Sequence, residues 1–163
     1  MVIDRIKKDA LENKVMVFFD MDGVMAEYGS GEKNAIFTNQ PGFYFNRRPI
    51  KTIINIVKEL NDLDNVEVGI ISNCYYEEQK QDKLKWLEIN LPFLKREYIC
   101  IIKLKDEEYT KETKDFIKSK YLKNMIIDKD VKVYFFEDDH GIIKATKKAL
   151  DYVNVEHVST LLD

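Results

Sequence analysis

The sequence predicts an α/β fold: a Rossmann-like parallel sheet of about five strands, with helices on both faces and a small cap inserted after the first strand. Two observations predict it. Short, continuous apolar runs recur along the chain, and amphipathic helical patterns lie between them. Runs of this kind are typical of strands buried on both faces, and their alternation with helices is typical of a parallel sheet.

The first strand is expected at residues 15–19, where a run of valine, methionine and phenylalanine ends abruptly in acid. The other expected strands are residues 66–71, 98–102, 131–136 and, more weakly, 153–158. The helical patterns that separate the strands cover residues 50–63, 77–91, 110–122 and 142–152. In the helix predicted at 77–91, Leu84, Leu87 and Leu91 form one stripe, and Pro92 ends it.

One segment breaks the alternation of strands and helices. Residues 24–48 follow the first strand and carry glycines and aromatic side chains without clear periodicity. A loop of this length inside a compact domain usually has a function. We therefore expect a single domain over residues 1–163, with a small cap insertion at about residues 24–48.

Composition narrows the range of partners. The 163 residues carry a net charge of −3 with acidic and basic side chains mixed, so neither a nucleic-acid polymer nor an anionic membrane is an expected partner. Cys74 and Cys100 are the only cysteines, too few for a disulfide framework. No run approaches the length of a membrane span, and the first fifteen residues do not form a signal peptide. We expect a cytoplasmic protein.

Polar groups gather where the predicted strands end. Asp20 and Asp22 follow the first strand, Ser72 and Asn73 the second, and the Asp138-Asp139 pair, preceded by Glu137, follows the fourth. Parallel strands deliver their carboxyl ends to one edge of the sheet, where ligands bind. Clustered carboxylates repel one another unless a cation relieves them, and oxygen ligands suit Mg²⁺. The sequence therefore predicts a metal site at this edge of the sheet.

The string from Phe18 to Val24 resembles the first motif of the haloacid dehalogenase superfamily of phosphohydrolases. Ser72 matches the second motif, and the Asp138-Asp139 pair matches the fourth, in the right order. The resemblance implies that Asp20 is a nucleophile that forms an aspartyl-phosphate, and that Asp22 protonates the leaving oxygen and then activates water. It also implies that Ser72 donates a hydrogen bond to the phosphoryl group. The metal ligands that it implies are Asp20, the backbone carbonyl of Asp22, Asp138 and Asp139.

The superfamily also uses a lysine that binds the phosphate. Lys114 is the preferred candidate because it opens the helix predicted after the third strand, and Lys111 is the second. The stretch from 106 to 123 is longer than usual for the family, which leaves the choice between the two lysines open.

Residues 15–159 resemble more narrowly the 5'(3')-deoxyribonucleotidase branch of the superfamily. The resemblance rests on Gln40 to Phe45 in the cap, on Lys83 to Leu87, and on the closing Asp138-Asp139-His140. Its implied substrate is a nucleoside monophosphate, whose base can stack on aromatic rings. The candidate substrate-binding residues are Asn73, Phe43, Tyr44 and Tyr75, with Arg47 or Arg48 as further phosphate contacts. The segment from 27 to 37 is short for this branch.

Three functions remain open at this point. The first is a nucleotidase, and the second is a phosphatase for another small ester, such as a sugar phosphate or a nucleic-acid terminal phosphate. The third is a catalytically silent phosphate-binding protein, although Asp20, Asp22 and the Asp138-Asp139 pair are all present. A homodimer is neither indicated nor excluded.

Overall fold

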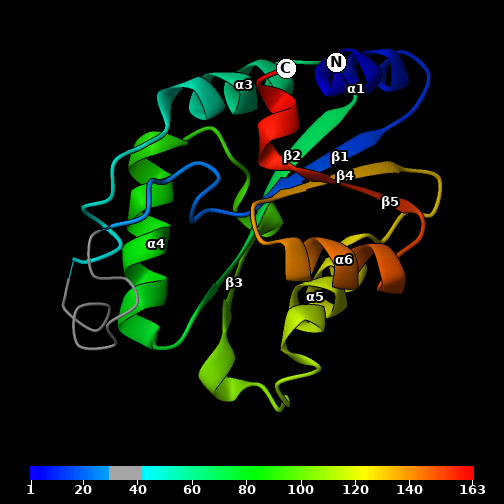
Figure 1. Cartoon of the computed structure of the whole chain (residues 1–163). Coiled ribbons are helices and arrows are strands. Elements are labelled where there is room, and N and C mark those ends of the chain that lie inside the picture. The colour runs from blue at the N-terminus through cyan, green and yellow to red at the C-terminus, as the bar shows by residue number, and fades with distance from the viewer. Residues whose placement is uncertain (30–41) are drawn as a thin grey trace.

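A computed structural model describes residues 1–29 and 42–163 of the chain. Its centre is one sheet of five parallel strands in the order β3-β2-β1-β4-β5 (Figure 1). The strands are β1 (Val15–Phe19), β2 (Val66–Cys74), β3 (Ile99–Lys103), β4 (Lys132–Glu137) and β5 (Val153–His157). The predicted α/β fold with a parallel sheet is therefore confirmed.

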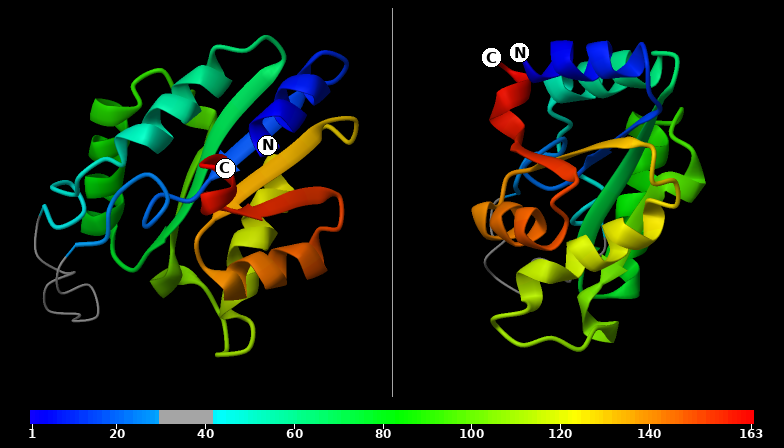
Figure 2. Two further views of the ribbon diagram at one scale, coloured as in Figure 1. Left: turned by 45° about the horizontal axis from the view of Figure 1, so that its top comes forward. Right: turned by 90° about the vertical axis from the view of Figure 1, so that its right-hand side faces the viewer.

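Helices cover both faces of the sheet (Figure 2). One face carries α1 (Val2–Ala10), α3 (Lys51–Asn61) and α4 (Glu77–Asn90), and the other carries α5 (Ile117–Met125) and α6 (His140–Ala149). The central strand β1 divides the core between them, because alternate side chains point to opposite faces. Val17 and Phe19 pack with the first group of helices, whereas Met16 and Phe18 pack with the second.

Two elements differ from their predicted forms. Helix α1 covers residues that the sequence analysis left without structure, and it buries Val2, Ile6 and Ala10 against the sheet. The helix predicted at 110–122 begins later, because residues 114–116 form a short 3-10 turn and the α-helix starts only at Ile117. The later start changes which lysine of this segment faces the sheet.

The predicted cap at residues 24–48 is described only in part, since residues 30–41 lie outside the described residues. Its two ends are anchored to the domain. Ala26 bridges to Pro49, the Gly42 amide donates to Asp82, and the Trp86 indole donates to the Arg47 carbonyl. The cap itself stays a prediction.

Strand order determines where a ligand can bind. The chain passes from β1 to β2 and β3 on one side of the sheet and then crosses to β4 and β5 on the other, so the order reverses between β1 and β4. Ligands of open α/β sheets bind beyond the carboxyl ends of the strands at such a reversal. Within residues 1–29 and 42–163, no helix is long and apolar enough to cross a bilayer.

Candidate active site

The register of β1, β2 and β4 brings the predicted polar residues to one level. Phe19 pairs with Phe136 on one side and with Ile70 on the other, and the Asp20 amide donates to the Phe136 carbonyl at 3.0 Å. Asp20 thus leaves the sheet beside the end of β4 and close to Ser72 of β2. A pocket of about 220 Å³ opens there. Its lining includes Asp20, Asp22, Tyr28, Tyr44, Arg47, Ser72, Asn73, Lys118, Glu137, Asp138 and Asp139.

A turn that only glycine fits well follows Asp22. Gly23 has a φ of 74°, in the left-handed region that side chains disfavour. A Cβ atom on Gly23 would lie 2.3 Å from Asp138 Oδ2 and 2.5 Å from the Tyr28 ring. Gly23 therefore lets the chain turn sharply beneath Asp138, while the Tyr28 hydroxyl donates to Asp138 Oδ2 at 2.6 Å.

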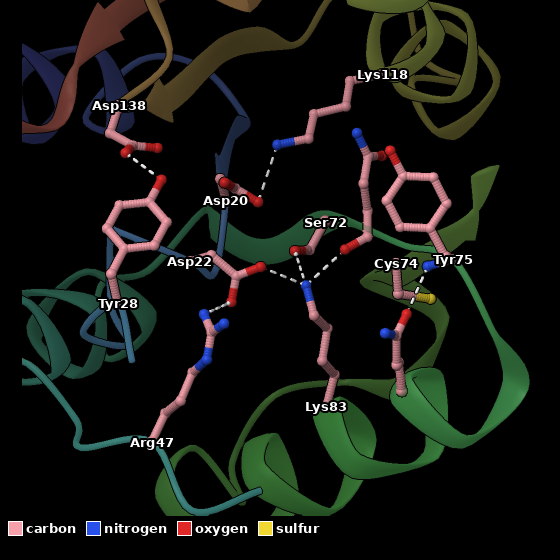
Figure 3. A network of polar contacts seen from close by, with 12 residues as sticks. Asp20, Asp22, Tyr28, Arg47, Ser72, Cys74, Tyr75, Lys83, Lys118 and Asp138 are labelled. Atoms are coloured by element: carbon pink, nitrogen blue, oxygen red, sulfur yellow. Dashed lines mark hydrogen bonds and ion pairs between the residues drawn. The ribbon is translucent and has the colours of Figure 1, made fainter. Parts of the chain in front are cut away.

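The lysine in the pocket is Lys118, which the sequence analysis did not single out. Its ammonium lies 2.9 Å from Asp20 Oδ1 and 2.6 Å from Glu137 Oε2, and its side chain is only 3% exposed (Figure 3). The preferred candidate, Lys114, instead points its ammonium at the Tyr75 hydroxyl, 3.2 Å away, and Lys111 is exposed. The place beside Asp20 that was predicted for Lys114 is thus taken by Lys118, four residues later in the sequence.

Charge and burial set the protonation of this group. Burial opposes ionisation of Asp20, but the ammonium of Lys118, helped by that of Lys83, outweighs it and lowers the Asp20 pKa. Burial, together with the charge of Asp20, raises the pKa of Glu137 despite the contact with Lys118. Burial opposes the charge on Lys118 too, yet the two carboxyls raise its pKa. Of the two carboxyl groups that contact Lys118, Asp20 is thus the one that ionises more readily, and Glu137 is the other.

Three carboxyl groups could hold a metal ion together. Ligand atoms of Asp20, Glu137 and Asp138 all lie within 4.8 Å of one another. This set of side chains includes Glu137 and lacks two of the predicted residues, Asp22 and Asp139. Metal binding by the backbone carbonyl of Asp22 stays a prediction. Asp139 caps helix α6, accepting from the Gly141 amide at 2.7 Å, and the Asp22 carboxylate is held by cations. The structure therefore brings Glu137, rather than Asp139, next to Asp20.

Asp22 sits on the other side of the pocket between two cations. Arg47 Nη1 lies 2.5 Å from its Oδ1, and Lys83 Nζ lies 2.5 Å from its Oδ2. Both basic side chains are buried, at 3% and 0% exposure. Lys83 also contacts Ser72, so the ends of β1 and β2 are tied together through α4 (Figure 3).

The candidate substrate-binding residues are divided by the structure. Asn73 and Tyr44 line the pocket, and Asn73 Oδ1 is a buried acceptor with no hydrogen-bond partner among the described residues. Phe43 packs edge-on against Tyr44, with ring centres 5.1 Å apart, and does not itself line the pocket. Tyr75 is exposed beside Lys114 and also lies outside the lining.

A sequence signal for the two missed lysines exists in hindsight. Lys118 shares the buried face of α5 with Ile117 and Leu122, and Lys83 shares that of α4 with Trp86 and Leu87. A lysine within the apolar stripe of an amphipathic helix must find a partner in the interior, because an unpaired buried charge is costly. Lys118 and Lys83 can therefore be recognised by their place within the apolar stripe of a helix, and not by their distance along the chain from a sequence motif.

Fold and site together define an α/β protein with an acidic, lysine-containing pocket at the reversal of its strand order. No family model matches the chain. Among solved structures, it is similar to a ferredoxin-NADP+ reductase from Plasmodium falciparum with 2'P-AMP, with a TM-score of 0.38 and 14% identity. The match covers 91% of this chain and 54% of that one, so the chain spans about half its length. A TM-score this low carries no functional information.

Proposed function

We propose that this chain is a metal-dependent phosphohydrolase in which Asp20 forms an aspartyl-phosphate. The observation that carries the proposal is the environment of Asp20: an ionised carboxylate at the end of the central strand, 2.9 Å from a buried ammonium and beside two further carboxyl groups. The ammonium of Lys118 holds the Asp20 carboxylate in place and offers positive charge to an incoming phosphate.

The acid cluster fits a hard divalent cation. Asp20, Glu137 and Asp138 supply only oxygen atoms, which is the chemistry that Mg²⁺ favours, and their ligand atoms are close enough to share one ion. Lys118 alone leaves these carboxyl groups with an excess of negative charge. Bound there, Mg²⁺ would neutralise that excess and the charge of a phosphoryl group.

The chain's own residues then account for the chemistry. An Asp20 oxygen attacks phosphorus, the bond from phosphorus to the ester oxygen breaks, and that oxygen takes a proton from Asp22, which enters the cycle in its protonated form and leaves this step as the carboxylate. Asp22 next takes a proton from water, which attacks the phosphorus of the aspartyl-phosphate. Inorganic phosphate leaves, and Asp20 is restored. Ser72 donates a hydrogen bond to the phosphoryl oxygens.

A nucleoside monophosphate is the proposed substrate class. Tyr28 lines the pocket, is 58% exposed and offers aromatic surface to a base or sugar, whereas the Tyr44 ring is buried against Arg47 and Lys83. The unpartnered Asn73 Oδ1 can accept from a ligand hydroxyl. Stacking of a base on an aromatic ring contributes about 1–3 kcal/mol.

A second candidate is a phosphatase for another small ester, such as a sugar phosphate. Two observations favour it. The pocket volume of about 220 Å³ is below the range of roughly 300–1,000 Å³ that is usual for whole small ligands. Phe43 and Tyr75, two of the expected base-binding residues, do not line it.

The test is a hydrolysis assay with Mg²⁺ on p-nitrophenyl phosphate, deoxyribonucleotides, ribonucleotides and sugar phosphates, compared by kcat/KM. The proposal predicts phosphate release that stops on chelation of the metal. A preference for nucleotides supports the first candidate, and a preference for sugar phosphates supports the second. Phosphate binding without turnover, over several divalent metals, would contradict both and indicate a binding protein.

A further inference from the structure

Lys83 is a fully buried charged side chain for which the proposed chemistry has no role yet. It is 0% exposed and lies on the inner face of α4 between Gln79 and Trp86. An ammonium in such a place is tolerated only when it is paired and hydrogen-bonded. Its partners therefore indicate why a lysine stands at this position.

Every donor of the Lys83 ammonium is used. It donates to Asp22 Oδ2 at 2.5 Å, to Ser72 Oγ at 3.0 Å and to the Asn73 carbonyl at 2.6 Å (Figure 3). A lysine ammonium has only three N–H groups, so none remains for a ligand in the pocket. The Tyr44 ring lies over the same ammonium, 4.7 Å from its nitrogen.

We propose that Lys83 is a positioning residue that sets the orientation of Asp22 and Ser72 without touching the substrate. The inference rests on the proposed function and deepens it, because it assigns to α4 the alignment of the acid–base group with the phosphoryl donor. Lys83 links the end of β1, through Asp22, to the end of β2, through Ser72.

The hydrogen of the Ser72 hydroxyl follows from this contact. Because Ser72 Oγ accepts from Lys83, its own hydrogen is free to be donated elsewhere. Ser72 lines the pocket, so that hydrogen is available to an oxygen of a bound phosphoryl group. Lys83 thereby sets Ser72 up as a donor.

Asp22 is fixed from two sides. Lys83 holds Oδ2 and Arg47 holds Oδ1, so the carboxylate cannot rotate without breaking an ion pair. Each carboxylate oxygen still carries a second lone pair, which can hold or receive the proton exchanged with the ester oxygen or with water. The clamp therefore restricts geometry and leaves proton transfer open.

The test uses Lys83→Met, which keeps an unbranched side chain of similar length and removes the charge. Lys85→Met, at an exposed position of the same helix, is the matched control. Turnover is measured on p-nitrophenyl phosphate, whose leaving group needs little protonation, and on an alkyl phosphate, whose leaving group needs it. We expect kcat to fall about 100-fold on the alkyl ester and less than about tenfold on the aryl ester. KM should stay within about threefold.

Three outcomes would overturn the inference. A rise of KM with kcat unchanged would make Lys83 a direct phosphate contact. Equal losses of kcat/KM on the two esters, a quantity that reports the steps up to phosphoryl transfer to Asp20, would remove the link to the acid–base group. An effect no larger than that of Lys85→Met would leave Lys83 with a packing role only.

A double-mutant cycle with Asp22→Asn separates this inference from the proposed function. If Lys83 acts through Asp22, then Lys83→Met costs little further kcat, on the alkyl ester, in the Asp22→Asn background. The same cycle in urea unfolding needs no turnover, and it also covers the case in which Lys83→Met alone does not fold. We expect the two losses of stability to be less than additive, because each single variant leaves one charge of the Lys83–Asp22 ion pair without the other, whereas the double variant removes both. Additive losses of stability would overturn the clamp, whereas absent turnover in the unaltered chain would overturn only the proposed function.

Discussion

Two charged clusters face each other across the pocket, and they differ in their balance of charge. The Lys118 cluster, formed by Asp20, Glu137 and Lys118, has more carboxyl groups than cations. The Lys83 cluster, formed by Asp22, Arg47 and Lys83, has more cations than carboxylates. Similar residue types are thus combined in opposite proportions within one pocket.

The difference in balance separates two tasks. In the Lys118 cluster, the raised pKa of Glu137 and the lowered pKa of Asp20 show that the site does not readily hold both charges, so a further cation is favoured there. In the Lys83 cluster, Asp22 already has a partner on each oxygen, so it gains rigidity. One cluster is suited to bind a metal and to carry the nucleophile, and the other is suited to hold the acid–base group Asp22 in one orientation.

The largest effect is expected from Asp20→Asn. An amide is no nucleophile, so turnover should fall by about a thousandfold or more while the fold persists. Phosphate release and circular dichroism measure the two properties. Activity that survives in this variant would remove the covalent mechanism and with it the distinct role of the Lys118 cluster.

The next effect separates the two candidate lysines. Lys118→Met removes the cation beside Asp20 and should cost about 10²–10³ in kcat, which is the usual loss for a preorganised electrostatic donor. Lys114→Met, which affects only the contact with Tyr75, should cost less than about threefold. A larger loss for Lys114→Met would return the phosphate-binding role to the residue that the sequence alone favours.

Metal affinity distinguishes the roles of Asp138 and Asp139. Asp138→Asn removes a member of the acid cluster and should weaken Mn²⁺ binding, read by electron paramagnetic resonance, more than about tenfold. Asp139→Asn should leave metal affinity nearly unchanged, because its side chain caps α6. Equal losses of metal affinity in the two variants would show that the predicted Asp138-Asp139 pair binds the metal as a unit.

The smallest expected effect concerns stability and pH. Lys118 favours the ionised forms of Asp20 and Glu137, so its contribution is present when these carboxyls are ionised. For Asp20, whose folded pKa is lowered, stability is present above the unfolded pKa of about 3.9 and is lost as pH falls through the folded pKa. The destabilisation by Lys118→Met, measured by urea unfolding, should therefore be larger near neutral pH than below about pH 3. The opposite order would contradict the ion pair.

The sequence analysis located the sheet and the polar residues that lie at the ends of its strands. The apolar runs located the sheet, and Asp20, Asp22 and Ser72 were found because each follows such a run. The side chains carried by helices were harder to place. The direction in which the Lys118 side chain points depends on where α5 begins. The 3-10 turn before Ile117 places that start later than periodicity predicts.

The acidic residues at the end of β4 were equally hard to assign from the sequence. Glu137 still belongs to the strand and points into the pocket, while Asp139 becomes the cap of α6. The end of β4 and the start of α6 are separated by only two residues, Asp138 and the cap Asp139. The buried carboxyl of Glu137 and the exposed cap Asp139 are thus only two positions apart, and composition alone does not determine which of them faces the pocket.

The most direct test of the central claim is to identify the residue that carries the phosphoryl group. The protein is mixed with a slowly hydrolysed ester and Mg²⁺, quenched in acid and digested, and its peptides are examined by mass spectrometry. The account predicts a phosphoryl group on Asp20, absent in Asp20→Asn and retained in Asp139→Asn. A phosphoryl group found on another residue, in a chain that turns over, would contradict the account.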